Sequence, residues 1–250
     1  MDEQELCKKR LVDLSRQADT RDIVTFSDFL NLNEQNIYHS NKSQYYTISK
    51  AFGGYENAER QMIAFIPDAL CYEWTYPICC ICISPVYPKY AEKLTHRDIL
   101  GALMSLGITR GKLGDIICQD SGFYVFAEEQ IADFIAAELT QIKHTTVQCS
   151  FLDDIQNLDV SPEYEEHSDM IASNRIDCII AKAYHLSRSQ ASEYLISEKV
   201  FVNGKCITNC NQDCDSGCII SVRGKGRFRF ETSQALSKKG KLKVSFYYYK

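Results

Sequence analysis

The spacing of apolar residues predicts a domain of alternating strands and helices in the middle of the chain, over residues 71–152. A near-continuous apolar run from Ile78 to Ile83 predicts a buried strand, and the helical spacing of apolar residues in His96–Leu106 predicts an amphipathic helix. The further elements expected here are a hairpin over Asp115–Cys118 and Gly122–Ala127 that turns at Asp120-Ser121-Gly122, a helix over Glu128–Ile142 and a strand over Thr145–Phe151. This order of strand, helix, strand, strand, helix, strand predicts a ferredoxin-like (RRM-like) domain, although no aromatic run suited to stacking RNA bases lies on the expected strands.

A second pattern of strands and helices occupies the last third of the chain. Val200–Val202 marks one strand, Asn203-Gly204 marks the turn that follows it, and Ile220–Val222 marks a later strand. Before these strands, an apolar helix is followed by Ser187 and Arg188. The serine can cap the next helix, and the arginine then stands in its first turn, where backbone N–H groups favour an anion such as phosphate.

The remaining segments complete an α+β chain of three parts. A polar helical pattern from Glu3 to Thr20 opens residues 1–70, which we expect to be a mainly helical N-terminal region. Acidic residues surround Ser161-Pro162, so residues 153–170 are expected to form a linker and hinge. Residues 171–250 then form the C-terminal domain.

Charge separates the C-terminal domain from the rest of the chain. Residues 171–250 contain 14 Lys and Arg against 6 Asp and Glu, a net charge of +8, whereas residues 1–170 contain 14 against 27, a net charge of −13. Phosphate neutralisation is local over a Debye length of about 8 Å at physiological salt, so a basic domain on an acidic body can bind nucleic acid. We therefore expect RNA affinity to reside in residues 171–250.

Composition favours a folded protein of the cytosol. The chain has 250 residues, of which 45% are hydrophobic, enough to build two or three cores. The acidic start after Met1 is unlike a signal peptide, and no apolar run approaches the roughly 18 residues that span a bilayer. We accordingly expect a cytoplasmic protein with no membrane partner, whose 12 cysteines are free thiols.

The C-terminal motifs resemble the RNA-binding module named after ribosomal protein S4. The series runs through Asn174-Arg175-Ile176-Asp177, Leu186 to Ala191, Val200 to Gly204 and Ser221 to Phe228. Together with motifs nearer the N-terminus, the chain resembles the bacterial YlmH family. Those motifs are Phe52-Gly53-Gly54-Tyr55 with Glu59-Arg60, His96 to Leu103 with Leu106 to Arg110, and Leu113-Gly114-Asp115-Ile116.

The resemblance implies a non-catalytic protein of ribosome-associated quality control. It would bind large ribosomal subunits that retain peptidyl-tRNA, and thus rRNA and tRNA, with no cofactor and no DNA partner. The RNA-binding residues that the resemblance implies are Arg175, Lys182, Ser187, Arg188, Lys199 and Lys205, with Arg223, Lys225, Arg227 and Arg229 on a second flank. For Asp177 we expect a local ion pair with Arg175.

One residue departs from the usual pattern of the module. The module usually has a glycine between its second helix and the next strand, where this chain has Ser197-Glu198-Lys199. Glu198 would stand where φ > 0 is often needed, at a cost of about 1 kcal/mol relative to glycine. We therefore expect a different geometry at the end of this helix.

Two other chemistries compete with RNA binding. Cys206, Cys210, Cys214 and Cys218 could supply four thiolates to zinc or an iron–sulfur cluster, but across a hairpin they would point in inconsistent directions, so we predict no stoichiometric metal. The S4-type module also occurs in pseudouridine synthases. Asp177 is superficially like a catalytic aspartate, yet residues 1–170 contain no nucleotide-binding fingerprint and no nucleophile set beyond chance, so we predict no enzyme.

Overall fold

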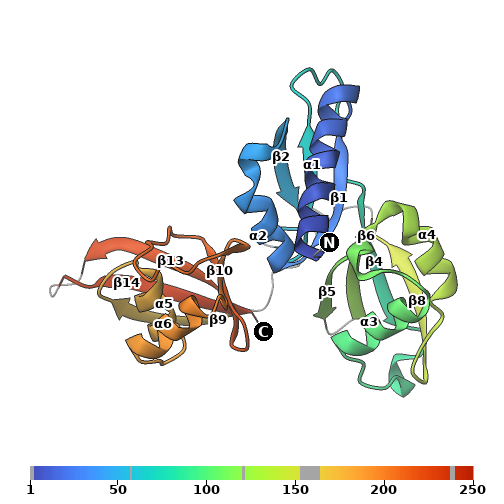
Figure 1. Cartoon of the computed structure of the whole chain (residues 1–250). Coiled ribbons are helices and arrows are strands. Elements are labelled where there is room, and N and C mark those ends of the chain that lie inside the picture. Colours follow the sequence, from blue (N-terminus) through green and yellow to red (C-terminus); the bar gives the residue numbers. More distant parts are fainter. Residues whose placement is uncertain (1–2, 57, 120–121, 153–163, 237–239, 250) are drawn as a thin grey trace. The chain divides into compact units, whose positions relative to one another are not determined.

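The protein folds into two compact units that each combine helices with antiparallel sheets (Figure 1). The computed structural model describes residues 3–56, 58–119, 122–152, 164–236 and 240–249. The first unit takes in Met1–Glu34 and Asn41–Val160, and the second takes in Gln35–Ser40 and Ser161–Lys250. The predicted α+β class is confirmed. Among the described residues, no helix is long and apolar enough to cross a membrane.

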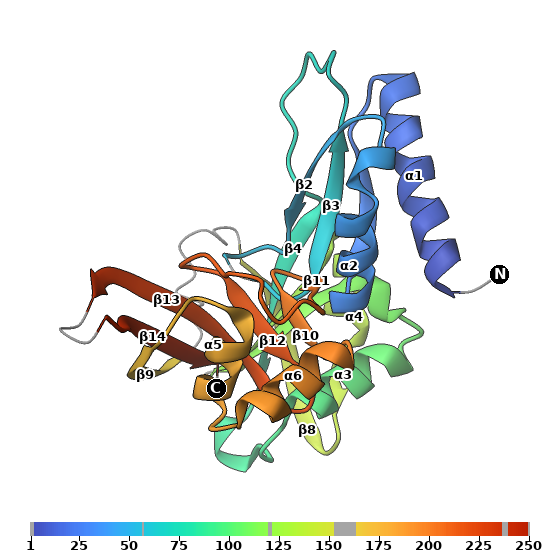
Figure 2. The same cartoon turned by 60° about the vertical axis from the view of Figure 1, so that its left-hand side comes forward.

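The N-terminal region contains a three-stranded sheet, so the prediction of a mainly helical region is wrong. The expected first helix is present as α1, over Glu3–Arg21. It is followed by β1 (Thr25–Leu30), α2 (Leu32–Ser40), β2 (Ile48–Phe52) and β3 (Gln61–Ile66), with the strands in the order β1-β3-β2. The central strand β3 is almost wholly buried, and α1 packs on the sheet through Leu11, Ser15 and Ala18 (Figure 2).

The middle region has the predicted alternation of strands and helices. The elements are β4 (Ile78–Pro85), α3 (His96–Ser105), β5 (Leu113–Gln119), β6 (Gly122–Glu128), α4 (Glu129–Glu138), β7 (Gln141–Ile142) and β8 (Thr145–Phe151), with strand order β5-β6-β4-β8-β7. Ile99 and Leu103 of α3, and Ala132 and Ile135 of α4, share a core with the apolar residues of this sheet. Asp120 and Ser121 of the predicted turn lie outside the described residues.

The second helix of the middle region is shorter than predicted. It ends at Glu138 and not at Ile142, because Gln141–Ile142 pairs with Thr145 and Thr146 as a short hairpin. Lys143, in the turn, takes a φ of 52°. Ile142, the apolar residue at the end of the expected helix, therefore belongs to a strand.

The first two sheets share one core, and two glycines allow their close approach. Phe29 and Met62 from the N-terminal sheet pack with Cys80 and Phe126 from the middle sheet. A Cβ on Gly114 would lie 2.8 Å from Phe29 Cε1 and 2.9 Å from Phe126 Cβ. On Gly54, whose φ is +100°, it would lie 2.3 Å from a ring carbon of Phe126. This face of the middle sheet is therefore covered by protein.

A polar network fixes the same junction. The Asp115 carboxylate accepts hydrogen bonds from the Tyr55 hydroxyl at 2.7 Å and from the backbone N–H groups of Glu59 and Arg60 at 2.6 and 3.1 Å. The buried guanidinium of Arg60 donates to the carbonyl oxygens of Leu113 at 2.9 Å, Phe29 at 2.6 Å and Arg110 at 3.2 Å. Hydrogen bonds thus join Tyr55, Glu59 and Arg60 of the N-terminal region to Leu113 and Asp115 of the middle region.

The loop that carries Arg110 and Lys112 is a tight turn. Residues Arg110–Lys112 form one 3₁₀ turn, and the Arg110 guanidinium donates to the carbonyl oxygens of Leu113 and Gly114 at 2.7 and 2.9 Å. Lys112 Nζ lies 3.2 Å from an Asp28 carboxylate oxygen and 2.5 Å from one of Glu128. Both cations therefore bind groups of the protein itself.

The C-terminal sheet has six strands and begins earlier than predicted. Its elements are β9 (Tyr164–Ile171), α5 (Ile176–Ala183), α6 (Arg188–Ile196), β10 (Val200–Val202), β11 (Lys205–Cys206), β12 (Ile219–Val222), β13 (Gly226–Leu236) and β14 (Leu242–Tyr249), in the strand order β11-β10-β12-β13-β14-β9. Helices α5 and α6 share a core with Phe228, Phe230 and Phe246 of the sheet. Because β9 pairs with β14 along its length, the end of the expected linker over 153–170 is a strand. The rest of that linker, with Ser161-Pro162, lies outside the described residues.

The end of α6 has the geometry that a glycine usually provides. Glu198 takes a φ of 55°, its N–H donates to Leu195 O at 3.0 Å, and the N–H of Lys199 donates to Tyr194 O at 3.0 Å. These two bonds form a Schellman motif. Glu198 does occupy the position with φ > 0, but the expectation of a different helix end is wrong.

The junction between the first two sheets predicts opposite effects for two Gly→Ala substitutions. We expect Gly114→Ala to lower the free energy of unfolding by about 1–3 kcal/mol, because its Cβ must displace Phe29 or Phe126. The matched control, Gly101→Ala in the exposed middle of α3, has open space around its Cβ and should raise that free energy by about 0.5–1 kcal/mol. Urea unfolding curves measure both, and equal effects would contradict the close packing described.

Candidate nucleic-acid interface

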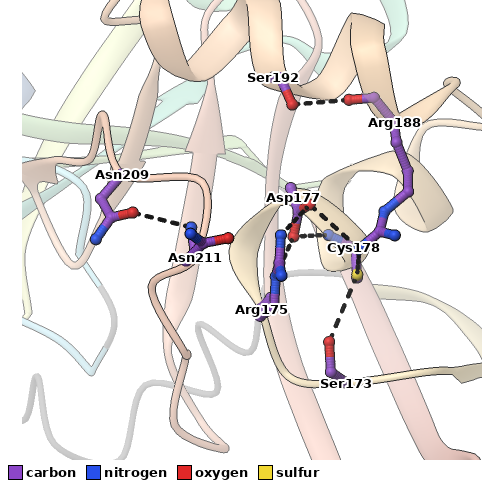
Figure 3. A network of polar contacts seen from close by, with 8 residues as sticks. All are labelled: Ser173, Arg175, Asp177, Cys178, Arg188, Ser192, Asn209 and Asn211. Atoms are coloured by element: carbon purple, nitrogen blue, oxygen red, sulfur yellow. Dashed lines mark hydrogen bonds and ion pairs between the residues drawn. The ribbon is translucent and has the colours of Figure 1, made fainter.

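The first turns of α5 and α6 bring two arginines to one carboxylate. Arg175 occupies the N-cap position of α5, and Arg188 is the first residue of α6. Arg175 Nε and a terminal nitrogen lie 3.0 and 2.8 Å from the two Asp177 oxygens, and an Arg188 nitrogen lies 3.4 Å from Asp177 Oδ2 (Figure 3). The expected local ion pair of Asp177 and Arg175 is confirmed, and it extends to a residue on the next helix.

Asp177 is a fixed anion that orients these cations. Its side chain is 5% exposed, and the backbone N–H of Cys178 also donates to it at 2.9 Å. Burial alone raises the pKa of Asp177, but the hydrogen bond and charge of Arg175, the bond from Cys178 and the charge of Arg188 outweigh burial and hold the pKa below its usual 3.8. Asp177 is therefore ionised at neutral pH.

Arg188 keeps most of its surface open to solvent while its direction is fixed. Its side chain is 65% exposed, and a second contact joins its guanidinium to Cys178 Sγ at 3.1 Å (Figure 3). The predicted cap is confirmed, because Ser187 Oγ accepts the N–H of Gln190 at 3.2 Å and Gln190 Oε1 accepts the N–H of Ser187 at 2.9 Å. An arginine held in this way can bind phosphate with little loss of side-chain freedom.

Lys199 and Arg223 lie next to each other, because Lys199 directly precedes β10 and Arg223 directly follows its antiparallel partner β12. The N–H of Arg223 donates to Lys199 O at 2.9 Å, and the Arg223 guanidinium lies 5.2 Å from the ring centre of Phe201. Lys205 on β11 and Lys225 in the turn before β13 are exposed. Lys182 is half exposed and lies 2.9 Å from Asp169 on β9. This ion pair offsets part of the positive charge that α5 would present.

Arg227 and Arg229 lie on the other face of the C-terminal sheet from α5 and α6. Residues alternate between the faces of a strand, and their neighbour Phe228 points into the core with the helices. The two guanidiniums stack on tyrosines of β9 and β14: Arg227 lies 4.0 Å from the ring centre of Tyr249, and Arg229 lies 5.3 and 5.0 Å from those of Tyr164 and Tyr247. The ten predicted residues therefore do not form one continuous surface.

The four regularly spaced cysteines are divided between core and surface. Cys214 and Cys218 are buried in the C-terminal core, and Cys206 and Cys210 are half-buried. The hydrogen bond with Cys214, together with burial, raises the pKa of Cys218. Within the described ranges, no three or more His, Cys, Asp or Glu side chains are grouped so as to hold a metal ion. That the protein holds no stoichiometric metal stays a prediction.

Comparisons with known proteins identify the family. The chain is 30% identical over 228 residues to the Bacillus subtilis (strain 168) ribosome-associated protein quality control protein P2, covering 89% of this chain and 86% of that protein. Residues 76–155 match a family model described as "Putative RNA-binding domain in YlmH". The chain belongs to the YlmH family. The resemblance to the YlmH family that was inferred from the motifs is thereby confirmed.

A solved structure of another YlmH protein has a similar fold. The cell division protein ylmH from Streptococcus pneumoniae aligns with a TM-score of 0.51 at 20% sequence identity, over 64% of this chain and 96% of that one. At this identity the likeness concerns the fold alone.

The YlmH family model directs attention to a part of the chain where sequence reasoning placed no RNA-binding residue. The family model matches residues 76–155 of this chain, which form the middle sheet with α3 and α4, whereas we expected RNA affinity in residues 171–250. Together the family model and the relative support a role in RNA binding. The middle region is thus a second candidate for RNA contact.

The buried carboxylate of Asp177 predicts a pH-dependent contribution to stability. We expect Asp177→Asn to lower the free energy of unfolding by about 1.5–3 kcal/mol at pH 7, because charge-assisted bonds to two arginines are weakened. Since the folded pKa lies below the unfolded value of about 3.9, this contribution is present above pH 4 and is lost as the pH falls through the folded pKa.

Urea unfolding at pH 7 and near pH 3 measures the difference between the two proteins. The control is Asp215→Asn, which changes an exposed residue of the same unit. A difference for Asp177→Asn that stayed constant with pH would show that the carboxylate charge does not stabilise the fold.

Proposed function

We propose that this protein binds structured RNA through its C-terminal unit, as an S4-type module and without catalysing a reaction. The observation that carries the proposal is the pair of helix-start arginines directed by Asp177, of which Arg188 is largely exposed. A net charge of +8 on residues 171–250 supplies the surrounding positive field. Planar guanidiniums at helix starts suit phosphate groups of a folded RNA.

A binding role accounts for Asp177 better than a catalytic one. Both of its carboxylate oxygens accept hydrogen bonds from arginine, and the side chain is buried. A catalytic nucleophile needs an oxygen directed at the substrate. We therefore interpret Asp177 as a positioning residue and propose no pseudouridine-synthase activity.

The cellular role that we propose is ribosome-associated quality control in the cytoplasm. The Bacillus subtilis relative bears that role in its name, and it covers most of this chain. We propose that the protein recognises large ribosomal subunits that retain peptidyl-tRNA, through rRNA and tRNA. One small basic module makes few phosphate contacts, so selectivity would come from avidity with a second contact by the first unit. The family match of residues 76–155 favours RNA as the target of that contact.

Arg188 predicts a change in the salt dependence of RNA binding. We expect Arg188→Gln to weaken binding of a tRNA and to reduce the slope of log affinity against log salt by about 0.7–0.9, because one phosphate contact is lost. Lys243→Gln removes one exposed charge from β14 of the same unit and should leave the slope nearly unchanged.

Filter binding or fluorescence anisotropy of the full-length proteins at several salt concentrations measures these slopes. Circular dichroism confirms that both variants are folded. Equal effects of the two substitutions would mean that bulk charge, and not the helix-start geometry, determines RNA affinity.

The ribosomal role predicts selective sedimentation. The full-length protein should sediment with large subunits that carry peptidyl-tRNA in preference to empty large subunits, small subunits or intact ribosomes. Sucrose gradients followed by immunoblotting measure this distribution, and Arg188→Gln should reduce the large-subunit fraction. An equal distribution over all particles and free tRNA would indicate a general RNA-binding protein and would contradict the quality-control role.

A further inference from the structure

Two tyrosines in the middle region are exposed to an unusual degree. Tyr87 is 66% and Tyr90 80% exposed, the highest values for aromatic side chains in the part of the chain that the structure describes. Both lie in the loop between β4 and α3, at the ends of a short turn over Pro88–Tyr90. Burying an aromatic ring is favourable, so two rings that do not join a core need another explanation.

The loop is held in place by the neighbouring hairpin. Before the turn, the N–H of Val86 donates to the backbone oxygen of Thr146 at 3.0 Å, and after it the N–H of Glu92 donates to the hydroxyl of buried Thr145 at 3.1 Å. Between these anchors, the N–H of Tyr90 donates to Tyr87 O at 3.0 Å, and Pro88 restricts its own φ. The two rings are therefore displayed on a shaped turn, which lowers the entropy cost of binding a ligand.

Positive charge accompanies the two rings. Lys89 Nζ lies 5.8 Å from the ring centre of Tyr90, and Lys93 and Arg97 are exposed farther along the segment. The acidic residues of this segment are Glu92 and Asp98, and Asp98 is bound by Lys143 at 2.7 Å. Exposed rings interleaved with cations match the stacked bases and phosphates of single-stranded RNA.

Part of one face of the middle sheet is not available for stacking RNA bases, because the N-terminal sheet covers it. Ile78, Cys80 and Phe126, which lie on the face away from α3 and α4, are buried against Phe29 and Met62 of the N-terminal sheet. In domains of this topology that bind RNA, bases stack on that face. RNA bases therefore cannot stack on this covered part of the sheet.

We propose that the loop of residues 86–93 binds unpaired nucleotides of RNA. Bases stack on Tyr87 and Tyr90, and Lys89 and Lys93 bind the adjoining phosphates. The proposal rests on the proposed RNA-binding function and deepens it, because it names a second contact in the first unit and gives that contact a preference for single strands.

The test uses full-length protein and a labelled unstructured RNA of about 12 nucleotides, within the usual site size for such surfaces. Tyr87→Ala and Tyr90→Ala should each weaken binding about 5- to 150-fold, the range expected for one lost base stack. Tyr87→Phe and Tyr90→Phe keep the rings and should bind as the unaltered protein does. The matched control is Tyr46→Ala, which removes a tyrosine that is 55% exposed and lies near Arg16 in the N-terminal region.

The outcomes separate this inference from the proposed function. Loss with both alanine variants and retention with the phenylalanine variants supports the loop site. If the alanine variants bind this RNA normally while Arg188→Gln still weakens tRNA binding, the loop proposal is overturned and the C-terminal function stands. If they bind RNA normally but no longer sediment with ribosomal particles, the loop contacts a protein and the proposal is likewise overturned.

Discussion

The buried guanidinium of Arg60 satisfies the backbone where the first two sheets meet, and the arrangement of the first unit depends on it. The guanidinium binds three carbonyl oxygens from two segments, that of Phe29 in β1 and those of Arg110 and Leu113, in the turn before β5 and at the start of β5. Without Arg60, the oxygens of Phe29 and Arg110 would lose these hydrogen bonds at a buried junction, whereas Leu113 O would keep its bond from the Arg110 guanidinium. Asp115 performs the complementary task for backbone N–H groups. These motif residues therefore stabilise the junction between the first two sheets.

Local sequence patterns predicted those elements whose signals are local. The alternation of Val200–Val202, the turn at Asn203-Gly204 and the cap at Ser187 depend only on neighbouring residues, and each is observed. The N-terminal sheet was missed because a short apolar run such as Gln61–Ile66 cannot be told from a buried helix segment by periodicity alone, and its partner strands β1 and β2 contain several polar residues. Strand β9 was missed for a different reason, since the acidic composition of Tyr164–Ile171 resembles a linker and its partner β14 is some 80 residues away.

In the candidate site, too, contacts between residues close in the sequence could be predicted, and contacts between distant residues could not. The pairing of Arg175 with Asp177 follows from their spacing, whereas the contact of Arg188 with that carboxylate requires the angle between two helices. Sheet register places Arg227 and Arg229 among tyrosines on the opposite face from α5 and α6, and their sequence spacing gave no sign of the distant strands that carry those rings. Basic residues that contribute to the same net charge can thus lie on separate surfaces.

The end of α6 has a consequence for recognising distant members of such a family. Glu198 keeps a φ of 55° and both bonds of the Schellman motif where a glycine is usual. The bonds that close the helix involve backbone atoms alone, so selection can preserve the conformation while the side chain drifts, provided that the fold tolerates a small loss of stability. A search pattern that requires glycine here would reject this chain, although a comparison of backbone angles would accept it.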